Sequence, residues 1–192
     1  MDMYNNRIIL LVGLMGSGKT SVGKRLARKL ALPFVDGDQE IEKAAGLSLV
    51  DVLKCFGEKE YRAGEERVMK RLLQGNPCVL ASGGGSFVAE QTRRLAKENA
   101  LTIWLKADID TLYFRTAGRT RRPFLLGDNA TIKEKLREYI SEEYPFYSEA
   151  DIVVETRNER VDNTVRRVLM AIKNYYRNNY QQINLSNKQE NK

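Results

Sequence analysis

The sequence contains no histidine, only two cysteines and no long apolar run. Without histidine, neither an imidazole general base nor a zinc site with thiolate and imidazole ligands can form. Cys55 and Cys78 have no neighbouring set of metal ligands and are interpreted as small thiols in a reducing compartment. The longest apolar run near the N-terminus, residues 8–12, is too short to span a membrane or to form the core of a secretory signal. These absences predict a cytoplasmic protein without membrane contact.

The chain has 192 residues and a formal net charge of +7. A basic protein attracts anions such as nucleic acids, phospholipids or small phosphorylated metabolites. The basic residues at positions 24–29 belong to one predicted helix and are interpreted as a solvated face. The aromatic side chains that would accompany a nucleic-acid surface are missing from residues 21–33. We therefore expect a small-molecule substrate and no nucleic acid, with a nucleotide-dependent nucleic-acid-binding module as the rival class.

Strand and helix patterns alternate along the chain. Strands are predicted at residues 8–12, 34–35, 78–81, 101–105 and 151–155. Helices are predicted from residue 19 up to Pro33 and at residues 48–56, 58–73, 90–99, 109–116, 132–143 and 161–176. This alternation predicts an α/β fold with three layers, in which helices cover both faces of a five-stranded parallel sheet.

The length suits one compact domain, which we place at residues 1–177. Residues 178–192 are polar, have almost no apolar periodicity and are expected to form a disordered tail. We expect the protein to be a monomer.

Residues 13–20, GLMGSGKT, match the P-loop pattern G-x-x-x-x-G-K-[ST], and they follow a predicted buried strand and precede a predicted helix. Glycines let the backbone N–H groups of such a loop surround a polyphosphate, and the N-terminus of the helix adds positive potential. Lys19 would supply a charge to the outer phosphates, and Thr20 a hydroxyl to Mg²⁺. The predicted ATP contacts in this segment are Gly16, Ser17, Gly18, Lys19, Thr20 and Ser21. Gly23, in the following helix, is expected to allow close packing of that helix on the sheet.

The second ligand of Mg²⁺ is expected from the end of the second strand. The third strand ends in Ser82 and glycines, and not in the aspartate of a Walker B strand. Asp36 and Asp38 follow the second strand, and alternate side chains of an extended chain share one face. One of the two, Asp36, would hold Mg²⁺ through water, while Asp38 would meet an acceptor hydroxyl.

Further motifs complete a pattern that resembles the shikimate kinases, which belong with the nucleoside-monophosphate-kinase-like P-loop proteins. The motifs are G-x-M-G-S-G-K-T at 13–20, D-x-D at 36–38, F-G-E-x-x-[FY]-R-x-x-E at 56–65, S-G-G-G at 82–85 and R-P-F-L at 122–125. The resemblance covers residues from about 7 to 169. It implies a P-loop kinase fold, with an acceptor-binding region at about 38–66 and a lid at about 117–130 that closes over the site.

The resemblance also implies roles for individual residues. Asp38 would hold the hydroxyl that is phosphorylated, and Arg62 the carboxylate of the acceptor ring, with contacts from the glycines Gly83, Gly84 and Gly85. Arg122 in the lid would reach the phosphates of ATP, and Arg115 would lie beside the adenine. Leu53, Tyr61 and Pro123 would line the acceptor pocket. The implied catalytic residues are Lys19, Asp38 and Arg122, and the implied cofactors are ATP as co-substrate and Mg²⁺.

One position departs from the family. The family usually has an arginine two residues before P-[LF]-Y, where it makes a second contact with the carboxylate of the acceptor, but this chain has Glu143 there. A glutamate facing a carboxylate would repel it. Either another basic residue substitutes, with Arg137 and Arg121 as candidates, or the affinity for the acceptor is low, or the acceptor differs.

The resemblance implies an ATP-dependent kinase that phosphorylates the 3-hydroxyl of shikimate in aromatic amino-acid biosynthesis. A P-loop kinase for another small hydroxy acid, such as gluconate, is the alternative within enzymes. Gluconate kinases share the Asp-x-Asp pattern but lack the combination of Gly-Gly-Gly and Arg-Pro.

Overall fold

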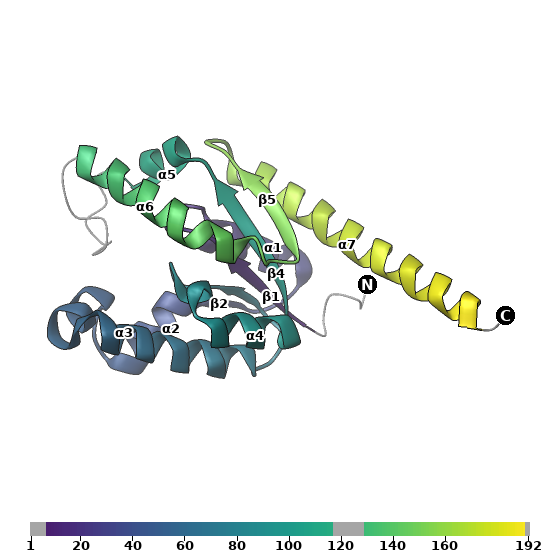
Figure 1. The fold of residues 1–192 in the computed structure, drawn as a ribbon, viewed down its shortest axis with the longest axis horizontal. Helices are drawn as coiled ribbons and strands as arrows, with labels where there is room; N and C mark the ends of the chain where they lie inside the picture. Colours follow the sequence, from purple (N-terminus) through teal and green to yellow (C-terminus); the bar gives the residue numbers. More distant parts are fainter. Residues whose placement is uncertain (1–6, 117–128, 191–192) are drawn as a thin grey trace.

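The computed structural model describes residues 7–116 and 129–190 of the chain. Its centre is a single parallel sheet with helices on both faces (Figure 1). The strands are β1 (Ile8–Val12), β2 (Phe34–Asp36), β3 (Val79–Ala81), β4 (Ala100–Ala107) and β5 (Ile152–Thr156). The sheet has five strands in the order β2-β3-β1-β4-β5, so that β2 and β5 form its two edges. The predicted α/β fold with a five-stranded parallel sheet is confirmed.

In the described residues, seven α-helices and one short 3₁₀ helix lie between or after these strands. They are α1 (Lys19–Leu30), α2 (Gly37–Ala45), α3 (Leu49–Leu73), the 3₁₀ helix η1 (Ser86–Val88), α4 (Glu90–Asn99), α5 (Ile109–Thr116), α6 (Asn129–Tyr147) and α7 (Val161–Glu190). Helices α4 and α5 have the predicted bounds. In the described part of the chain, no helix is long and apolar enough to cross a membrane.

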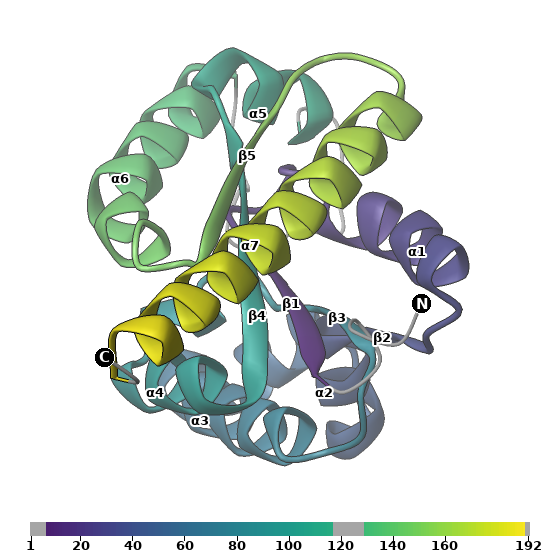
Figure 2. The same cartoon turned by 90° about the vertical axis from the view of Figure 1, so that its right-hand side faces the viewer.

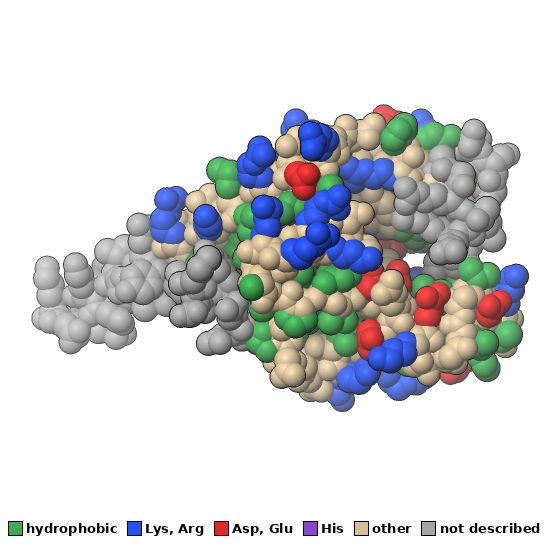
Figure 3. Space-filling model, turned by 180° about the vertical axis from the view of Figure 1, so that it is seen from behind, with side chains coloured by type: hydrophobic (Ala, Val, Ile, Leu, Met, Phe, Trp, Pro, Cys, Tyr) green, Lys and Arg blue, Asp and Glu red, His purple; other side chains and the backbone are tan. Residues whose placement is uncertain are grey.

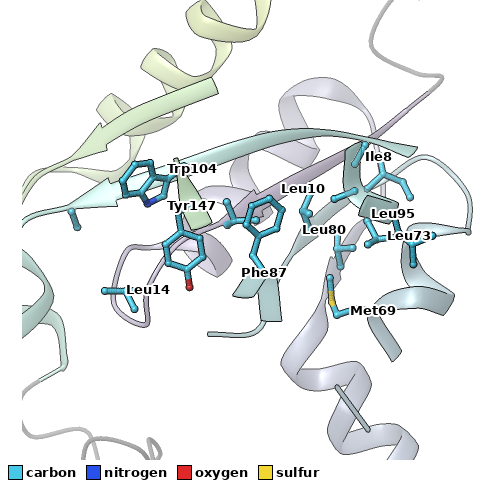
Figure 4. Packing of buried hydrophobic residues seen from close by; sticks show 14 of the residues in the cluster. Ile8, Leu10, Leu14, Met69, Leu73, Leu80, Phe87, Leu95, Trp104 and Tyr147 are labelled. Carbon is cyan, nitrogen blue, oxygen red and sulfur yellow. The ribbon is translucent and has the colours of Figure 1, made fainter. Parts of the chain in front are cut away.

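The central strand β1 is buried on both faces, and its alternating side chains divide the core in two. Ile9 and Leu11 pack with apolar residues of α1 and α7 on one face. Ile8, Leu10 and Val12 pack on the other face with residues of α3, α4 and α6. Figure 4 shows this second cluster, in which the rings of Phe87, Trp104 and Tyr147 lie close to one another. Figure 2 shows α6 and α1 on opposite sides of the sheet, so that the fold has three layers, helices, sheet and helices.

Two helices extend beyond their predicted ends. Helix α6 was expected to end at residue 143 but continues through Pro145 to Tyr147. Its last turn is held by aromatic packing, since the rings of Tyr144 and Tyr147 lie 4.8 and 6.0 Å from that of Trp104. Helix α7 was expected to end at residue 176 but continues to Glu190, because the segment contains no glycine or proline that would interrupt it.

Helix α3 contains a break that the sequence predicts as the boundary between two helices. Gly57 has φ 78° and ψ 172°, a conformation that other residues rarely adopt, and an added Cβ atom there would meet nothing within 4 Å. The break separates the first turns of α3, which run from Leu49 to Phe56, from the part that carries Arg62.

Gly23 lies where α1 meets the sheet, and we expect Gly23→Ala to destabilise the fold. An added Cβ atom would lie 2.5 Å from a ring carbon of Phe34 and 3.3 Å from Leu11 Cδ1. Forcing a methyl group into a packed core costs about 1–3 kcal/mol, which exceeds the gain of roughly 0.5–1 kcal/mol from replacing glycine by alanine in a helix. Urea denaturation of the purified variant measures the difference.

Gly64 in α3 is a matched control for this prediction. It is also a helical glycine, but an added Cβ atom would meet only the end of the Arg67 side chain, at 3.8 Å. Gly64→Ala should therefore leave the free energy of unfolding unchanged or raise it. Equal effects of the two substitutions would show that close packing at Gly23 does not stabilise the fold.

Candidate active site

The P-loop, residues 13–20, joins the carboxyl end of β1 to the first turn of α1. Gly13, Gly16 and Gly18 have φ values of 135°, 87° and 102°, which favour glycine. An added Cβ atom on Gly13 would lie 2.7 Å from the carbonyl oxygen of Leu105. The loop therefore packs directly on the neighbouring strand β4, and its tight path depends on the glycines that the motif provides.

Lys19 is the first residue of α1, and its side chain turns back along the P-loop. Its Nζ donates hydrogen bonds to the carbonyl oxygens of Gly13, at 2.5 Å, and Leu14, at 3.2 Å. The side chain is buried. The loop thus holds a positive charge at the place where the phosphates of a nucleotide would lie.

Thr20 and Asp36 are brought together from α1 and the end of β2. The Thr20 hydroxyl donates a hydrogen bond of 2.9 Å to Asp36 Oδ2. Ser17 of the P-loop and Ser82, which follows β3, have buried hydroxyls without a hydrogen-bond partner within the described residues. Among those residues, no group of three or more histidine, cysteine, aspartate or glutamate side chains could hold a metal ion. One hydroxyl and one carboxylate fit Mg²⁺, which takes its remaining ligands from phosphates and water.

The prediction that Asp36 and Asp38 lie in one extended segment is wrong. Asp36 ends β2 and caps the N-terminus of α2, because its Oδ1 accepts a hydrogen bond of 3.2 Å from the backbone N–H of Asp38. Asp38 belongs to the first turn of this helix, which the sequence analysis did not predict. An aspartate before a helix is a capping signal as well as a turn signal, and tertiary packing decides between them.

Asp38 nevertheless reaches the glycine-rich loop after β3. An added Cβ atom on Gly83 would lie 2.6 Å from Glu65 Oε1 and 2.8 Å from Asp38 Oδ1. The two carboxylates therefore lie against bare backbone, and a side chain at position 83 would displace them. The same loop adjoins the P-loop, since an added Cβ atom on Gly84 would lie 3.8 Å from the backbone nitrogen of Met15.

Arg62 on α3 faces this loop and is tied to it by hydrogen bonds. Its Nη1 donates to Glu65 Oε2 at 2.9 Å and to the carbonyl oxygen of Gly84 at 3.3 Å. Its Nη2 lies 3.5 Å from Glu58 Oε1. Arg62 and Asp38 thus approach the same loop, as predicted for residues that share an acceptor site.

Glu65 belongs to the motif at 56–65, but the sequence analysis gave it no role. It is buried, and the Tyr61 hydroxyl donates to its Oε1 at 3.3 Å. Burial raises the pKa of Glu65 to about 7, although the positive charge of Arg62 acts in the opposite direction. Its spacing of three residues from Arg62 on a helix is the signal that could have identified this pair.

Glu143 is buried on α6, on the side of the acceptor site. Its Oε2 accepts a hydrogen bond from the Tyr147 hydroxyl, and the charges of Arg62 and Lys19 act on it. Burial raises the pKa of Glu143. Of the two basic residues predicted to compensate it, Arg137 is exposed and Arg121 lies outside the described residues. Arg62 and Lys19 are therefore the cations that the structure places around this carboxyl group.

Arg115, predicted to lie beside an adenine, packs on the P-loop. Its Nη1 donates to the carbonyl oxygens of Gly16 and Ser17, both at 3.2 Å, and its Nη2 donates to that of Arg157. Leu53 is half-buried in α3, close to the small core cluster that contains Tyr61, and Ser21 is exposed on α1. Arg122, Pro123 and nearly all of the predicted lid at 117–130 lie outside the described residues, so their roles stay predictions.

Comparison with known proteins points to one family. The family model described as shikimate kinase matches residues 15–173. A shikimate kinase of Paramagnetospirillum magneticum is 48% identical over 170 residues, which are 88% of this chain and 86% of the relative. A shikimate kinase of Bartonella henselae is 39% identical over 175 residues, which are 91% of this chain and 82% of the relative.

Solved structures agree with this result. The shikimate kinase from Acinetobacter baumannii in complex with shikimate has a TM-score of 0.84 and 30% identity, and the match covers 89% of this chain and 95% of that one. A gluconokinase from Sinorhizobium meliloti has a TM-score of 0.60 and 21% identity, over 92% of this chain and 97% of that one. The second likeness extends to the fold alone.

The buried carboxyl group of Glu65 should make the stability of the fold depend on pH. Its pKa rises from an ordinary 4.5 to about 7 on folding. Between these values the folded protein keeps a proton that the unfolded chain has lost. The stabilisation is therefore full below about pH 4.5 and is lost as the pH rises through about 7.

Glu65→Gln removes this titration, so the free energy of unfolding of the unmodified protein should fall relative to the variant between pH 4.5 and pH 7. The fall is on the order of 1.4 kcal/mol for each unit of difference in pKa. Urea denaturation at a series of pH values measures it. Glu60→Gln is the control, because it removes the same charge from an exposed position on the same helix. The same slope in both variants would contradict the raised pKa of Glu65.

Proposed function

The chain belongs to the shikimate kinase family, and from this premise we propose that it transfers the γ-phosphoryl group of ATP to the 3-hydroxyl of shikimate. The observation that supports this proposal best is the contact between the two loops at the carboxyl edge of the sheet. Gly84 adjoins Met15 of the P-loop and also accepts a hydrogen bond from Arg62. A phosphate donor on the P-loop and a carboxylate-bearing acceptor at Arg62 would therefore lie side by side.

In this proposal the residues of the chain bind, orient and accept a proton. Lys19 neutralises charge on the transferred group, together with Arg122 of the lid, and Arg115 contacts the adenine. Arg62 binds the carboxylate of shikimate, and Asp38 orients the 3-hydroxyl. A bond forms between the hydroxyl oxygen and the γ-phosphorus while the bond to the bridging oxygen of ADP breaks, and the hydroxyl proton passes to Asp38.

Mg²⁺ is the metal that suits the residues present. Thr20 and Asp36 would hold it, and it supplies positive charge to the phosphates when bound. Residues 117–130 would act as the lid, which limits the access of water to the phosphoryl group. We also propose that the protein acts as a monomer in the cytoplasm.

The rival functions have less support. Arg25 on α1 pairs with Asp162, and Lys24, Arg28 and Lys29 are exposed on that helix. On the face seen in Figure 3, several Lys and Arg side chains adjoin one another across the middle, and acidic side chains lie beside a hollow. The match to the shikimate kinase family favours a small-molecule acceptor over a nucleic acid. Gluconate stays the alternative acceptor, because a gluconokinase shares the fold.

An assay of ADP release with different acceptors tests the proposal. We expect ATP turnover that depends on shikimate, with little turnover on gluconate or on nucleoside monophosphates. Lys19→Ala should lower kcat by about 10²-fold or more, since one preorganised charge at the transferred group contributes that much. Lys29→Ala, which removes an exposed lysine from the same helix, is the control. Equal turnover of gluconate and shikimate would reject the proposed acceptor.

Asp38→Asn should separate chemistry from nucleotide binding. The amide keeps the shape of the side chain but cannot accept the hydroxyl proton, so kcat should fall about 10²- to 10⁴-fold, as is typical for the loss of a general base. The KM for ATP should change little. Asp51→Asn is the control, because Asp51 also lies in the first turn of a helix but is exposed. A variant at position 38 with normal kcat and weaker ATP binding would remove Asp38 from the acceptor site.

A further inference from the structure

The peptide group that joins Gly84 to Gly85 is held from both sides. Its carbonyl oxygen, that of Gly84, accepts a hydrogen bond of 3.3 Å from Arg62 Nη1. Its N–H group, that of Gly85, donates a hydrogen bond of 3.3 Å to the hydroxyl oxygen of Tyr147. One side chain from α3 and one from α6 therefore fix the orientation of a single peptide plane at the centre of the proposed acceptor site.

Glu143 determines how Tyr147 takes part in this arrangement. The Tyr147 hydroxyl has one hydrogen, and it donates this hydrogen to Glu143 Oε2 over 2.5 Å. The lone pairs of the same oxygen are then directed toward other donors, among them the N–H group of Gly85. Burial raises the pKa of Tyr147, so the hydroxyl keeps its proton. With a carboxyl group as the partner, the hydroxyl has one consistent orientation.

The surroundings of Glu143 connect it to the acceptor side. Both Glu143 and Tyr147 are buried, and the charge of Arg62 acts on the Glu143 carboxyl group. An added Cβ atom on Gly85 would lie 3.0 Å from Arg62 Nη1, so the guanidinium packs directly against this loop. A rotation of the peptide plane would therefore move both the carbonyl oxygen that Arg62 contacts and the surface on which it rests.

We propose that Glu143 is a positioning residue for acceptor binding, which acts through Tyr147 and the peptide group between Gly84 and Gly85 to hold Arg62 in place. The inference rests on the proposed function, since Arg62 is the residue that would bind the carboxylate of shikimate. It assigns a role to the glutamate that stands where the resemblance to the family leads us to expect an arginine. Glu143 does not touch the acceptor in this role; it orients the groups that do.

Three variants test the chain of contacts. Tyr147→Phe keeps the buried ring and removes the hydroxyl, Glu143→Leu removes the hydrogen-bond acceptor, and Glu143→Gln keeps an oxygen that can accept from Tyr147. We expect the first two to raise the KM for shikimate about tenfold, the size of effect that the loss of one buried hydrogen bond has. Glu143→Gln should stay within about threefold of the unmodified protein, because a neutral acceptor weakens the bond without removing it.

The double variant shows whether the two residues act as one unit. If Glu143 acts through Tyr147, then the combination of Glu143→Leu and Tyr147→Phe should raise the KM for shikimate no further than either change alone. For Tyr147→Phe, which removes no charge near Lys19, the KM for ATP and kcat should stay within about twofold, since the contacts of the P-loop are untouched. Independent effects that multiply in the double variant would overturn the proposal.

Tyr144→Phe is the matched control for a merely structural effect. Tyr144 lies on the same helix, packs on Trp104 and donates its hydroxyl hydrogen to the carbonyl oxygen of Ala107, away from the glycine loop. Loss of the Tyr144 hydroxyl should lower the midpoint of thermal unfolding as Tyr147→Phe does, but should leave the KM for shikimate unchanged. If both tyrosine variants raise this KM equally, or if a folded Tyr147→Phe does not raise it, the positioning role is rejected. If the unmodified protein shows no turnover that depends on shikimate, the proposed function fails instead.

Discussion

The contact between Arg62 and Glu65, which is an ion pair once Glu65 has lost its proton, is the interaction on which the acceptor side of the site depends. Its N–O distance is 2.9 Å, and the glutamate side chain is almost fully buried. Taking a carboxylate out of water is costly, and a pair of this kind is stable only if further hydrogen bonds satisfy both partners. Tyr61 and the carbonyl oxygen of Gly84 provide such bonds. Arg62 is thus oriented before any acceptor arrives, which lowers the entropy lost on binding.

The parts of the fold that could be predicted are those with a local signal in the sequence. The continuous apolar run of β1 and the complete P-loop motif predict a buried strand, a phosphate-binding turn and a helix, and the structure has this order. Helix α2 was missed because an aspartate and a glycine after a strand indicate a turn as readily as a helix cap. Asp36 also accepts a hydrogen bond from Thr20, a contact between separate segments that no short pattern contains.

In the candidate site, too, only the features with a local signal in the sequence could be predicted. Asp38, Arg62 and the glycines at 83–85 were predicted to share a site, and the structure brings them together. The link from Glu143 through Tyr147 to Gly85 could not be predicted, because the hydrogen bond between Gly85 and Tyr147 joins residues 62 positions apart in the chain. The burial of Glu65 could not be predicted either, because it depends on the packing of α3 against the glycine loop. The local motifs predict which residues belong to the site. The raised pKa of Glu65 and the fixed peptide group between Gly84 and Gly85 arise instead from the packing of α3 and α6 around one loop.

The two edges of the sheet bear on how the protein behaves at high concentration. An edge strand offers unpaired backbone groups to other chains and can nucleate aggregation. Here β2 is only three residues long, which leaves little backbone for a second strand to pair with. Strand β5 is longer, but the charged side chains of Glu155 and Arg157 stand at its exposed end. Crowded molecules would therefore have to bury these charges before two sheets could join edge to edge.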